Sequence, residues 1–403
     1  MAAANKQYLH PDSRWMLVLL AAMVSLGPLS IDMYLPAMPA MREALDTSVA
    51  NIQLTLSAYL TGFAVFHLFC GPLADRFGRK PILIGGTAIF IIACIGCSLS
   101  TSVEQLIAFR LLQGLGACVG PTLSRAVTRD LFGPRRAAKA LSIIAMLMAL
   151  APAVAPSLGS AMLIIFPWSS IFVFLAIYGL LMVYLVHYFL PESLPQRQSL
   201  HPLSIGRNYR ELSVSPSFMV VALGCSLCYA AMMSYLAASG FVYLEMLGVP
   251  IQYFGLIFLT TVVGYFIGSA SSAKLASHFE SDQVVRMGAI LAASACLIML
   301  TCSSIWPQSI WALMLPTMIY TASLGMVLPH AMNLALQPYP HMAGTASALF
   351  GFIQMGVSAA ASGAVGLLLS DSPAPMVWLM SILAGLGLIL LLRVRSLDPP
   401  QET

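Results

Sequence analysis

Stretches of about twenty uncharged and mainly apolar residues recur along this chain, from Trp15 almost to its C-terminal end. A helix of about 20 apolar residues spans the hydrocarbon core of a bilayer, which is about 30 Å thick. Only 8% of the 403 residues are charged, whereas soluble globular chains carry about 25%. The sequence therefore predicts an all-α integral membrane protein, because so few charges would not cover a water-exposed surface.

Charged residues and helix breakers divide these stretches into twelve expected transmembrane helices. Six precede a polar stretch, residues 191–216, and six follow it. We expect this stretch to be a cytoplasmic linker between an N-terminal six-helix bundle (1–190) and a C-terminal one (217–403), the internal-repeat plan common in transporters. The expected helices are 15–37, 50–72, 81–101, 105–127, 139–164, 168–190, 217–243, 251–274, 285–304, 309–335, 343–369 and 374–393.

The basic residues predict the orientation, because Lys and Arg collect in the cytoplasmic loops of membrane proteins. With a cytoplasmic N-terminus, all 19 basic residues fall on the inner side except Arg42, outside, and Arg110, within a span. Both termini are therefore expected in the cytoplasm. The first apolar stretch is longer than the apolar region of a usual secretory signal, so we expect a retained span.

Two C-x-x-C pairs, 94/97 and 225/228, lie within apolar stretches. No neighbouring cation would stabilise a thiolate there, so we interpret these cysteines as packing residues. The histidines are scattered, and no hydrolytic triad or phosphate-binding loop is present in the expected spans. The sequence thus predicts no metal, no cofactor and no nucleic-acid partner, and it disfavours an enzyme or receptor.

Asp32 and Arg110 are the only charged residues deep within expected spans. Ionisable groups in such positions are costly and usually serve a function. Asp32 lies about 27 Å along its helix from the basic residue Arg14, and Arg110 lies about 28 Å along its helix from the basic residue Arg129. This similar depth predicts that they pair. Two roles stay open: a proton-coupling site, or a fixed ion pair that only holds two spans together.

Residues 71–81, GPLADRFGRKP, predict a tight cytoplasmic turn between two helices. Asp75 is favoured near a helix start, and the basic residues would meet the anionic leaflet. An ordinary basic anchor would have the same composition. The stretch resembles the G-x-L-x-D-R-x-G-R-K/R loop of the major facilitator superfamily, at the position where that family has it.

Further stretches carry the resemblance. Residues 110–117, RLLQGLGA, resemble the family's R-x-x-Q-G-x-G-A motif. Residues 151–160, APAVAPSLGS, resemble its antiporter motif G-x-x-x-G-P-x-x-G-G, with alanine for the first two glycines and serine for the last. Residues 31–39 and 340–347 are similar to the Bcr/CflA group of multidrug:proton antiporters.

The resemblance covers the whole chain and implies a secondary active transporter. The expected protein is a monomer in the bacterial inner membrane that exports a small amphipathic substrate in exchange for protons, by rocking two bundles in the lipid bilayer. Amphenicols, bicyclomycin-like compounds, sulfonamides and nucleosides all fit. Uptake or facilitated movement of a nutrient or nucleoside is the alternative, because the fold does not fix direction.

Further roles follow from residue type and from the resemblance. Polar-tipped side chains suit a substrate cavity, although helix contacts explain them equally well. The expected cavity residues are Tyr34, Tyr59, His67, Tyr229, Tyr235, Asn333 and Gln354, of which His67 stands where the family more often has glutamine and is a second candidate for titration. The residues expected to gate the conformational change are Gly71, Asp75, Arg76, Gly78, Arg79, Arg129, Pro152, Pro156 and Gly159.

Two expectations concern contacts. Arg125 and Arg129 are the basic residues nearest to Asp75 in predicted position, and we expect them to be its partners. The small-residue pairs Gly116/Gly120 and Gly264/Gly268 are expected to permit close helix packing.

Overall fold

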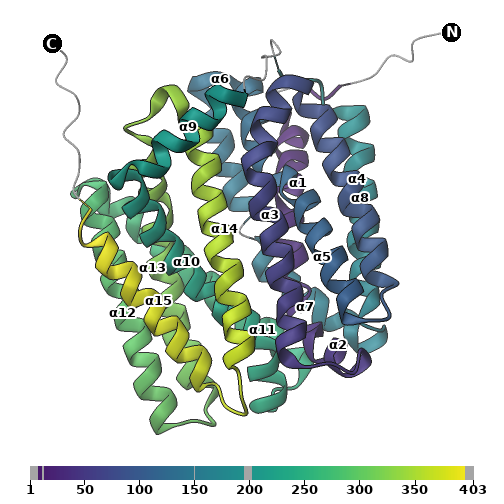
Figure 1. The fold of residues 1–403 in the computed structure, drawn as a ribbon, viewed down its shortest axis with the longest axis vertical. Helices are drawn as coiled ribbons and strands as arrows, with labels where there is room; N and C mark the ends of the chain where they lie inside the picture. Colours follow the sequence, from purple (N-terminus) through teal and green to yellow (C-terminus); the bar gives the residue numbers. More distant parts are fainter. Residues whose placement is uncertain (1–7, 11–12, 149, 195–201, 395–403) are drawn as a thin grey trace. The chain divides into compact units, whose positions relative to one another are not determined.

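The computed structural model describes residues 8–10, 13–148, 150–194 and 202–394 (Figure 1). All regular structure in these residues is helical, which confirms the predicted class. Eleven described helices are long and apolar enough to cross a membrane, and one shorter apolar helix, α7, accompanies them. The chain therefore has the build of a multi-pass membrane protein.

The helices of the first half run as follows: α1 (Arg14–Asp32), η1 (Leu35–Ala37), α2 (Met38–Ala44), α3 (Val49–Phe77), α4 (Arg79–Ser98), α5 (Val103–Ala117), α6 (Val119–Met148), α7 (Leu150–Ile165) and α8 (Ser169–Phe189). The helices of the second half are α9 (Pro202–Val214), α10 (Pro216–Gly240), the π-helical turn η2 (Phe241–Met246), α11 (Ile251–Leu275), α12 (Ser281–Ile305), α13 (Ile310–Leu336), η3 (Pro340–Met342), α14 (Ala343–Leu368) and α15 (Ala374–Leu391).

Serine caps set several of these helix starts. The side chains of Ser48, Ser102 and Ser215 accept hydrogen bonds from backbone N–H groups in the first turns of α3, α5 and α10. Such caps satisfy donors that the helix itself leaves unpaired. Because these serines precede apolar stretches, helix starts were predicted more closely than helix ends.

Several helix ends differ from the expected ones. The first apolar helix continues through η1 and α2 to Ala44, and α3 passes through Gly71 and Pro72 to end at Phe77. The expected tight turn is therefore confined to Gly78, whose φ of +108° suits a residue without a side chain. The expected fourth and fifth spans meet within one described helix, because α6 runs from Val119 to Met148 and the boundary between the spans is only a kink at Gly133.

The chain divides into two compact units, residues 1–201 with 250–255, and residues 202–249 with 256–403. The expected boundaries at 190 and 217 stay a prediction. Helix α9 lies within the expected linker and packs against α10 and α14 of the second unit (Figure 1).

Glycines let helix backbones approach closely in both units. Gly62 and Gly114 face backbone of the opposite helix where α3 crosses α5. Gly264 and Gly268 face the carbonyl groups of Met318 and Ala322 where α11 crosses α13. The expected packing role of the glycine pairs is confirmed, and the second and fourth long helices of each unit cross in the same way.

Large apolar side chains cover much of the outer surface. Ile92, Ile177 and Leu297 are exposed by 60%, 61% and 63%. Contiguous apolar surface of this kind marks contact with a membrane or partner. These side chains belong to helices long enough to span a bilayer, so their exposed surface suits contact with lipid hydrocarbon.

Candidate functional site

Arg110 on α5 is fully buried, and aromatic rings surround its guanidinium. The guanidinium carbon lies 4.2 Å from the ring centre of Tyr34, 4.5 Å from that of Tyr59 and 5.9 Å from that of Phe172. A cation within about 6 Å of a ring face is attracted by the ring's quadrupole, more strongly when water is excluded. The rings therefore stabilise a buried positive charge without an anion.

One nitrogen of the guanidinium makes all its hydrogen bonds. Nη1 of Arg110 donates to the carbonyl oxygen of Ser30 at 3.2 Å and to Oε1 of Gln113 at 2.6 Å. Gln113 in turn donates from Nε2 to Sγ of Cys94 at 3.0 Å. Nε and Nη2 of Arg110 are buried and make no hydrogen bond with any residue that the structure describes. These two atoms form the edge that binds a carboxylate through two parallel hydrogen bonds.

Asp32 is the last residue of α1 and is only 6% exposed. The expected ion pair with Arg110 is not formed: within the described part of the chain, no hydrogen bond or ion pair reaches the Asp32 carboxyl group. The contact of Arg110 with Ser30, two residues earlier on α1, nevertheless places the guanidinium beside the end of that helix. Both groups are buried, and each lacks the partner that the other could supply.

Tyr34 and Tyr59, two of the expected cavity residues, are fully buried against Arg110. The hydroxyl group of Tyr34 shares a hydrogen bond with that of Thr55, and the hydroxyl group of Tyr59 donates to the carbonyl oxygen of Gly27 at 3.3 Å. The tyrosine hydroxyl groups thus form hydrogen bonds with α3 and α1, and the faces of the two rings lie against the guanidinium of Arg110. In this structure they pack around the charge.

Helix α7, which contains the stretch similar to the antiporter motif, packs next to Asp32. A Cβ atom at Gly159 would lie 2.5 Å from the carbonyl oxygen of Met33, so only glycine permits this approach. Pro156 lies within α7 and is buried, and Pro152 lies in its first turn. The expected gating segment therefore contacts the backbone one residue after the candidate coupling carboxylate.

The other expected cavity residues are dispersed. His67 on α3 has its Nε2 3.4 Å from the hydroxyl oxygen of Thr122, while its Nδ1 is buried without a hydrogen bond. In the second unit, the hydroxyl group of Tyr235 lies 3.0 Å from that of Tyr243. The remaining three are Tyr229 and Gln354, half-buried on α10 and α14, and Asn333, exposed on α13.

A cavity of about 200 Å³ lies in the second unit, near the α12–α13 and α14–α15 connections. Trp306, Trp378 and several serines line it. None of the seven expected cavity residues is among its lining.

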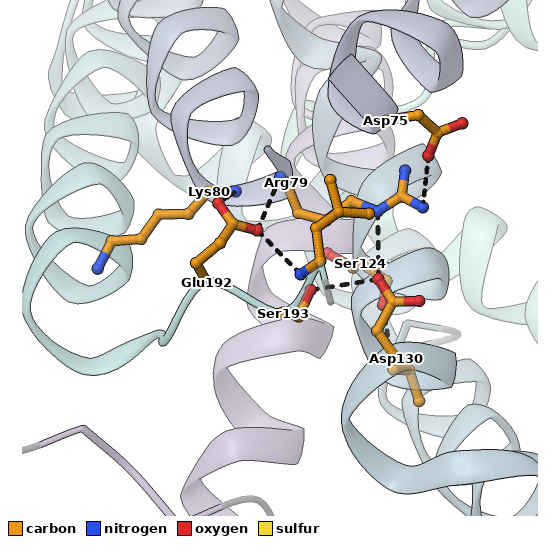
Figure 2. A network of polar contacts seen from close by, with 9 residues as sticks. Asp75, Arg79, Lys80, Ser124, Asp130, Glu192 and Ser193 are labelled. Atoms are coloured by element: carbon orange, nitrogen blue, oxygen red, sulfur yellow. Dashed lines mark hydrogen bonds and ion pairs between the residues drawn. The ribbon is translucent and has the colours of Figure 1, made fainter. Parts of the chain in front are cut away.

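A second cluster surrounds the turn between α3 and α4 (Figure 2). Arg79, the first residue of α4, pairs with Asp75 of α3 at 2.7 Å and with Asp130 of α6 at 3.2 Å. Ser193, which follows α8, donates to the same Asp130 carboxylate at 3.3 Å. One guanidinium therefore joins three helices. The expected pairing of Asp75 with Arg125 or Arg129 is wrong.

Glu192 caps the start of α4. Its two carboxylate oxygens accept from the backbone N–H groups of Arg79, at 2.9 Å, and Lys80, at 3.2 Å. A carboxylate there complements the helix dipole. A Cβ at Gly78 would lie 2.5 Å from Oε2 of Glu192, so glycine also makes room for the cap. Lys80 Nζ donates to the carbonyl oxygens of His187, at 2.8 Å, and Leu190, at 2.7 Å, which attaches α4 to the end of α8.

The remaining expected gating residues have smaller roles in this cluster. Arg76 lies over the ring of its neighbour Phe77, and Arg129 is exposed. Asp130, Glu192 and Ser193 were not predicted as site residues. A signal was present in the sequence, because Asp130 and Glu192 are acidic residues just beyond the expected ends of two spans, in loops that also carry basic residues.

Comparisons with known proteins agree with the fold. Residues 19–363 match the family described as Major Facilitator Superfamily. An uncharacterized MFS-type transporter, YdgK, of Bacillus subtilis is 33% identical over 92% of each chain. A bicyclomycin resistance protein homolog of Haemophilus influenzae is 30% identical over 88% of this chain and 89% of its own length. Multidrug resistance protein MdtL of Escherichia coli O157:H7 is 31% identical over 83% and 84%.

Solved structures show the same fold. A D-xylose-proton symporter superposes with a TM-score of 0.74 over 95% of this chain and 99% of its own, at 16% identity. An identity this low shows the fold alone. The family match runs from within α1 into α14 and so takes in parts of both units, and the relatives match along most of their length. This chain is therefore a transporter of the Major Facilitator Superfamily.

Proposed function

We propose that this protein is a proton-coupled efflux antiporter that exports small amphipathic drugs or metabolites by alternating access. The observation that carries the proposal is Asp32, a buried carboxyl group without a partner, near Arg110, a buried guanidinium with an unoccupied edge. Relatives named for bicyclomycin resistance, chloramphenicol resistance and multidrug resistance support the substrate class.

Two arrangements can stabilise Asp32. A buried carboxylate without a partner is costly, so its charge is removed by a proton or balanced by a cation. In the first arrangement Asp32 holds a proton, and Arg110 stays against its tyrosines. In the second, Asp32 is ionised and accepts hydrogen bonds from Nε and Nη2 of Arg110. Alternation between the two, coupled to the facing state, would load a proton outside and release it inside.

The same site limits the substrate. A single deep carboxylate balances one positive charge, which disfavours dications and suits neutral or monocationic amphipathic compounds. An accumulation panel of amphenicols, bicyclomycin-like compounds, sulfonamides and nucleosides, in a host without its own pumps, identifies the class. Substrate-driven alkalinisation of inverted vesicles previously acidified by respiration demonstrates exchange for protons, whereas uptake without proton movement contradicts it.

The deciding variant is Asp32→Asn, which keeps the shape of the side chain and removes its titration. We expect the purified variant to bind substrate but to release no proton on binding, and we expect gradient-driven export to be lost. Arg110→Lys keeps the charge but loses the planar edge, so partial activity is expected. If Asp32→Asn releases as many protons as the parent protein, another residue carries the proton, and His67 is the next candidate.

A fixed ion pair makes a different prediction. In that case, either single neutral variant would fail to fold, and the double variant Asp32→Asn/Arg110→Gln would recover. Membrane expression of the three variants distinguishes the two roles, because the coupling role leaves Asp32→Asn folded.

We further propose the finer arrangement that the charges favour. The protein would have twelve spans, with the last part of α6 and α7 together forming the fifth, and both termini would be cytoplasmic. Bundles of residues 1–190 and 217–403 would move against each other in the bacterial inner membrane, and the protein would act as a monomer. The distribution of the 19 basic residues supports this orientation.

A further inference from the structure

The connection between α11 and α12 has no counterpart of the charged cluster around Arg79. Residues 272–280, SAKLASHFE, occupy the corresponding place in the second unit and repeat neither the aspartate nor the arginines of residues 75–79. A different side chain holds these helix ends together. It is His330, on α13.

His330 joins three helices of the second unit. Its Nε2 lies 2.8 Å from the hydroxyl oxygen of Ser272 on α11, and its Nδ1 lies 3.1 Å from that of Ser281, the first residue of α12. Ser272 is 3% exposed, and the imidazole is half-buried. The three residues are separated by 49 and 58 positions in sequence, so this contact is tertiary.

Small residues bring the three helices within reach. Gly325 on α13 contacts the backbone of α11 so closely that a Cβ would lie 2.6 Å from the nitrogen of Ser269. Gly288 on α12 likewise faces α13, with a Cβ position 3.2 Å from the carbonyl oxygen of Ser323. Ser272 and His330 follow these crossings by about one turn. The crossings therefore position the imidazole between the two hydroxyl groups.

The chemistry of this contact allows it to survive protonation. A neutral imidazole has one N–H donor and one acceptor nitrogen, and a hydroxyl group can act as either, so both hydrogen bonds form. A protonated imidazole donates from both nitrogens, and the two hydroxyl oxygens accept.

The surrounding charges are few. On the helices packed against α13, α10 and α14 carry no charged residue, α11 carries Lys274, and α12 carries Asp282 and Arg286. Arg286 pairs with Asp282 at 3.0 Å and also donates to the carbonyl oxygen of Val394. The acidic partner on α12 is thus already engaged, and the imidazole relies on hydroxyl groups alone.

We propose that His330 is a positioning residue that keeps the inner ends of α11, α12 and α13 together as one rigid body during transport. It would be an uncharged alternative to the cluster of Asp75, Arg79 and Asp130 in the first unit. The claim that His330 joins these helix ends rests on the contacts alone. The claim that this joining matters for transport rests on the proposed function.

A labelling experiment tests the first claim without any substrate. Val284 is fully buried one turn after Ser281, and Val284→Cys in a cysteine-free background provides a thiol at the joined helix ends. His330→Ala should raise its labelling rate by N-ethylmaleimide several-fold, and His330→Gln, which keeps a donor and an acceptor, should restore most of the protection. His278→Ala is the control, because His278 is exposed and, among the described residues, its side chain forms hydrogen bonds only with Ser277 and Lys274 of the same segment. Unchanged labelling in a folded His330→Ala protein would overturn the proposal.

Two further measurements complete the test. If His330→Ala does not accumulate in membranes, the double variant Ser272→Ala/Ser281→Ala removes the same contacts, and the same labelling outcomes apply. In vesicles, the alanine variant should lower kcat several-fold and leave KM within about twofold, and the glutamine variant should keep the parent's pH profile. A pH profile shifted by His330→Gln would overturn the positioning role, because His330 would then titrate in the cycle. Loss of export in the parent protein would contradict the proposed function but would leave the labelling result standing.

Discussion

Arg110 contacts only neutral groups within the described residues: the rings of Tyr34, Tyr59 and Phe172, an amide and a backbone carbonyl. Each desolvated cation–π contact contributes up to about 2 kcal/mol, so the guanidinium can remain buried while no anion pairs with it. Under the proposed function, this arrangement would let Asp32 change its charge without expelling Arg110 from the site. A lysine would lack the flat surface that stacks between the rings.

Asp75 and Asp130 share Arg79, and a substitution separates their roles. We expect Asp75→Asn to insert and fold, with an unfolding temperature close to the parent's, because its pair is 35% exposed on the carboxylate side and such pairs contribute about 0–1 kcal/mol. Turnover should fall several-fold, since the bond between the ends of α3 and α4 is weakened. Export by normally expressed Asp75→Asn at the parent's rate would reduce the turn to a topological anchor, and Asp130→Asn is the matched comparison.

The sequence was sufficient to select the charged residues of the site but not to assign their partners. Counting residues gives depth along a helix, whereas each residue also turns the side chain by about 100°, and that direction depends on packing. The counted depth put Asp32 and Arg110 at the same level, but the guanidinium contacts Tyr34, Tyr59 and Ser30 instead of the carboxyl group. Asp75 likewise contacted Arg79, because α3 continues to Phe77 and places the carboxylate beside the turn.

Helices pack in this protein where glycine removes a side chain from the contact. The crossings of α3 with α5, of α7 with the end of α1, and of α11 with α13 all depend on it. Sequence patterns predicted the existence of these helices well, because apolar length is a strong signal in lipid. They predicted the ends less well, because Gly71 and Pro72 did not stop α3, and α6 continues past a kink at Gly133.

The contact of α7 with α1 gives a prediction for Gly159. In Gly159→Ala the new methyl group would meet the Met33 carbonyl, so α7 must move away from the backbone beside Asp32. We expect proton release on substrate binding and export to fall together, about tenfold, with membrane expression retained. Gly85→Ala serves as the control, since a Cβ there meets nothing within 4 Å. Full activity of Gly159→Ala would show that α7 adjusts freely.

The two units use different side chains to join the ends of neighbouring helices. Each crosses its second and fourth long helices through glycines, yet in one the helix ends are joined by carboxylates and a guanidinium, and in the other by an imidazole and hydroxyl groups. The two halves therefore need not repeat each other in sequence. The shared part is backbone geometry, which many small residues can satisfy, and the polar groups at the ends differ.

The orientation of the whole molecule is tested by labelling from outside intact cells. Single cysteines replacing Asp46 and Asp371, in a cysteine-free background, should react with an impermeant thiol reagent. Cysteines replacing Arg135, or Gln198, which lies outside the described residues, should not. Reaction at position 198 would overturn the arrangement of six spans on each side of the linker.

The lack of charged residues on four helices of the second unit has an electrical consequence. Helices α10, α13, α14 and α15 contain no Asp, Glu, Lys or Arg within their described residues, so a voltage across the bilayer would act on the cycle mainly through Asp32, Arg110 and the transported species. If one proton enters for each substrate molecule that leaves, export of a neutral compound moves one net charge and responds to the membrane potential, worth about 2.3 kcal/mol per 100 mV. Export of a monovalent cation moves none. The same carboxyl group would then make one protein electrogenic toward one drug and electrically silent toward another.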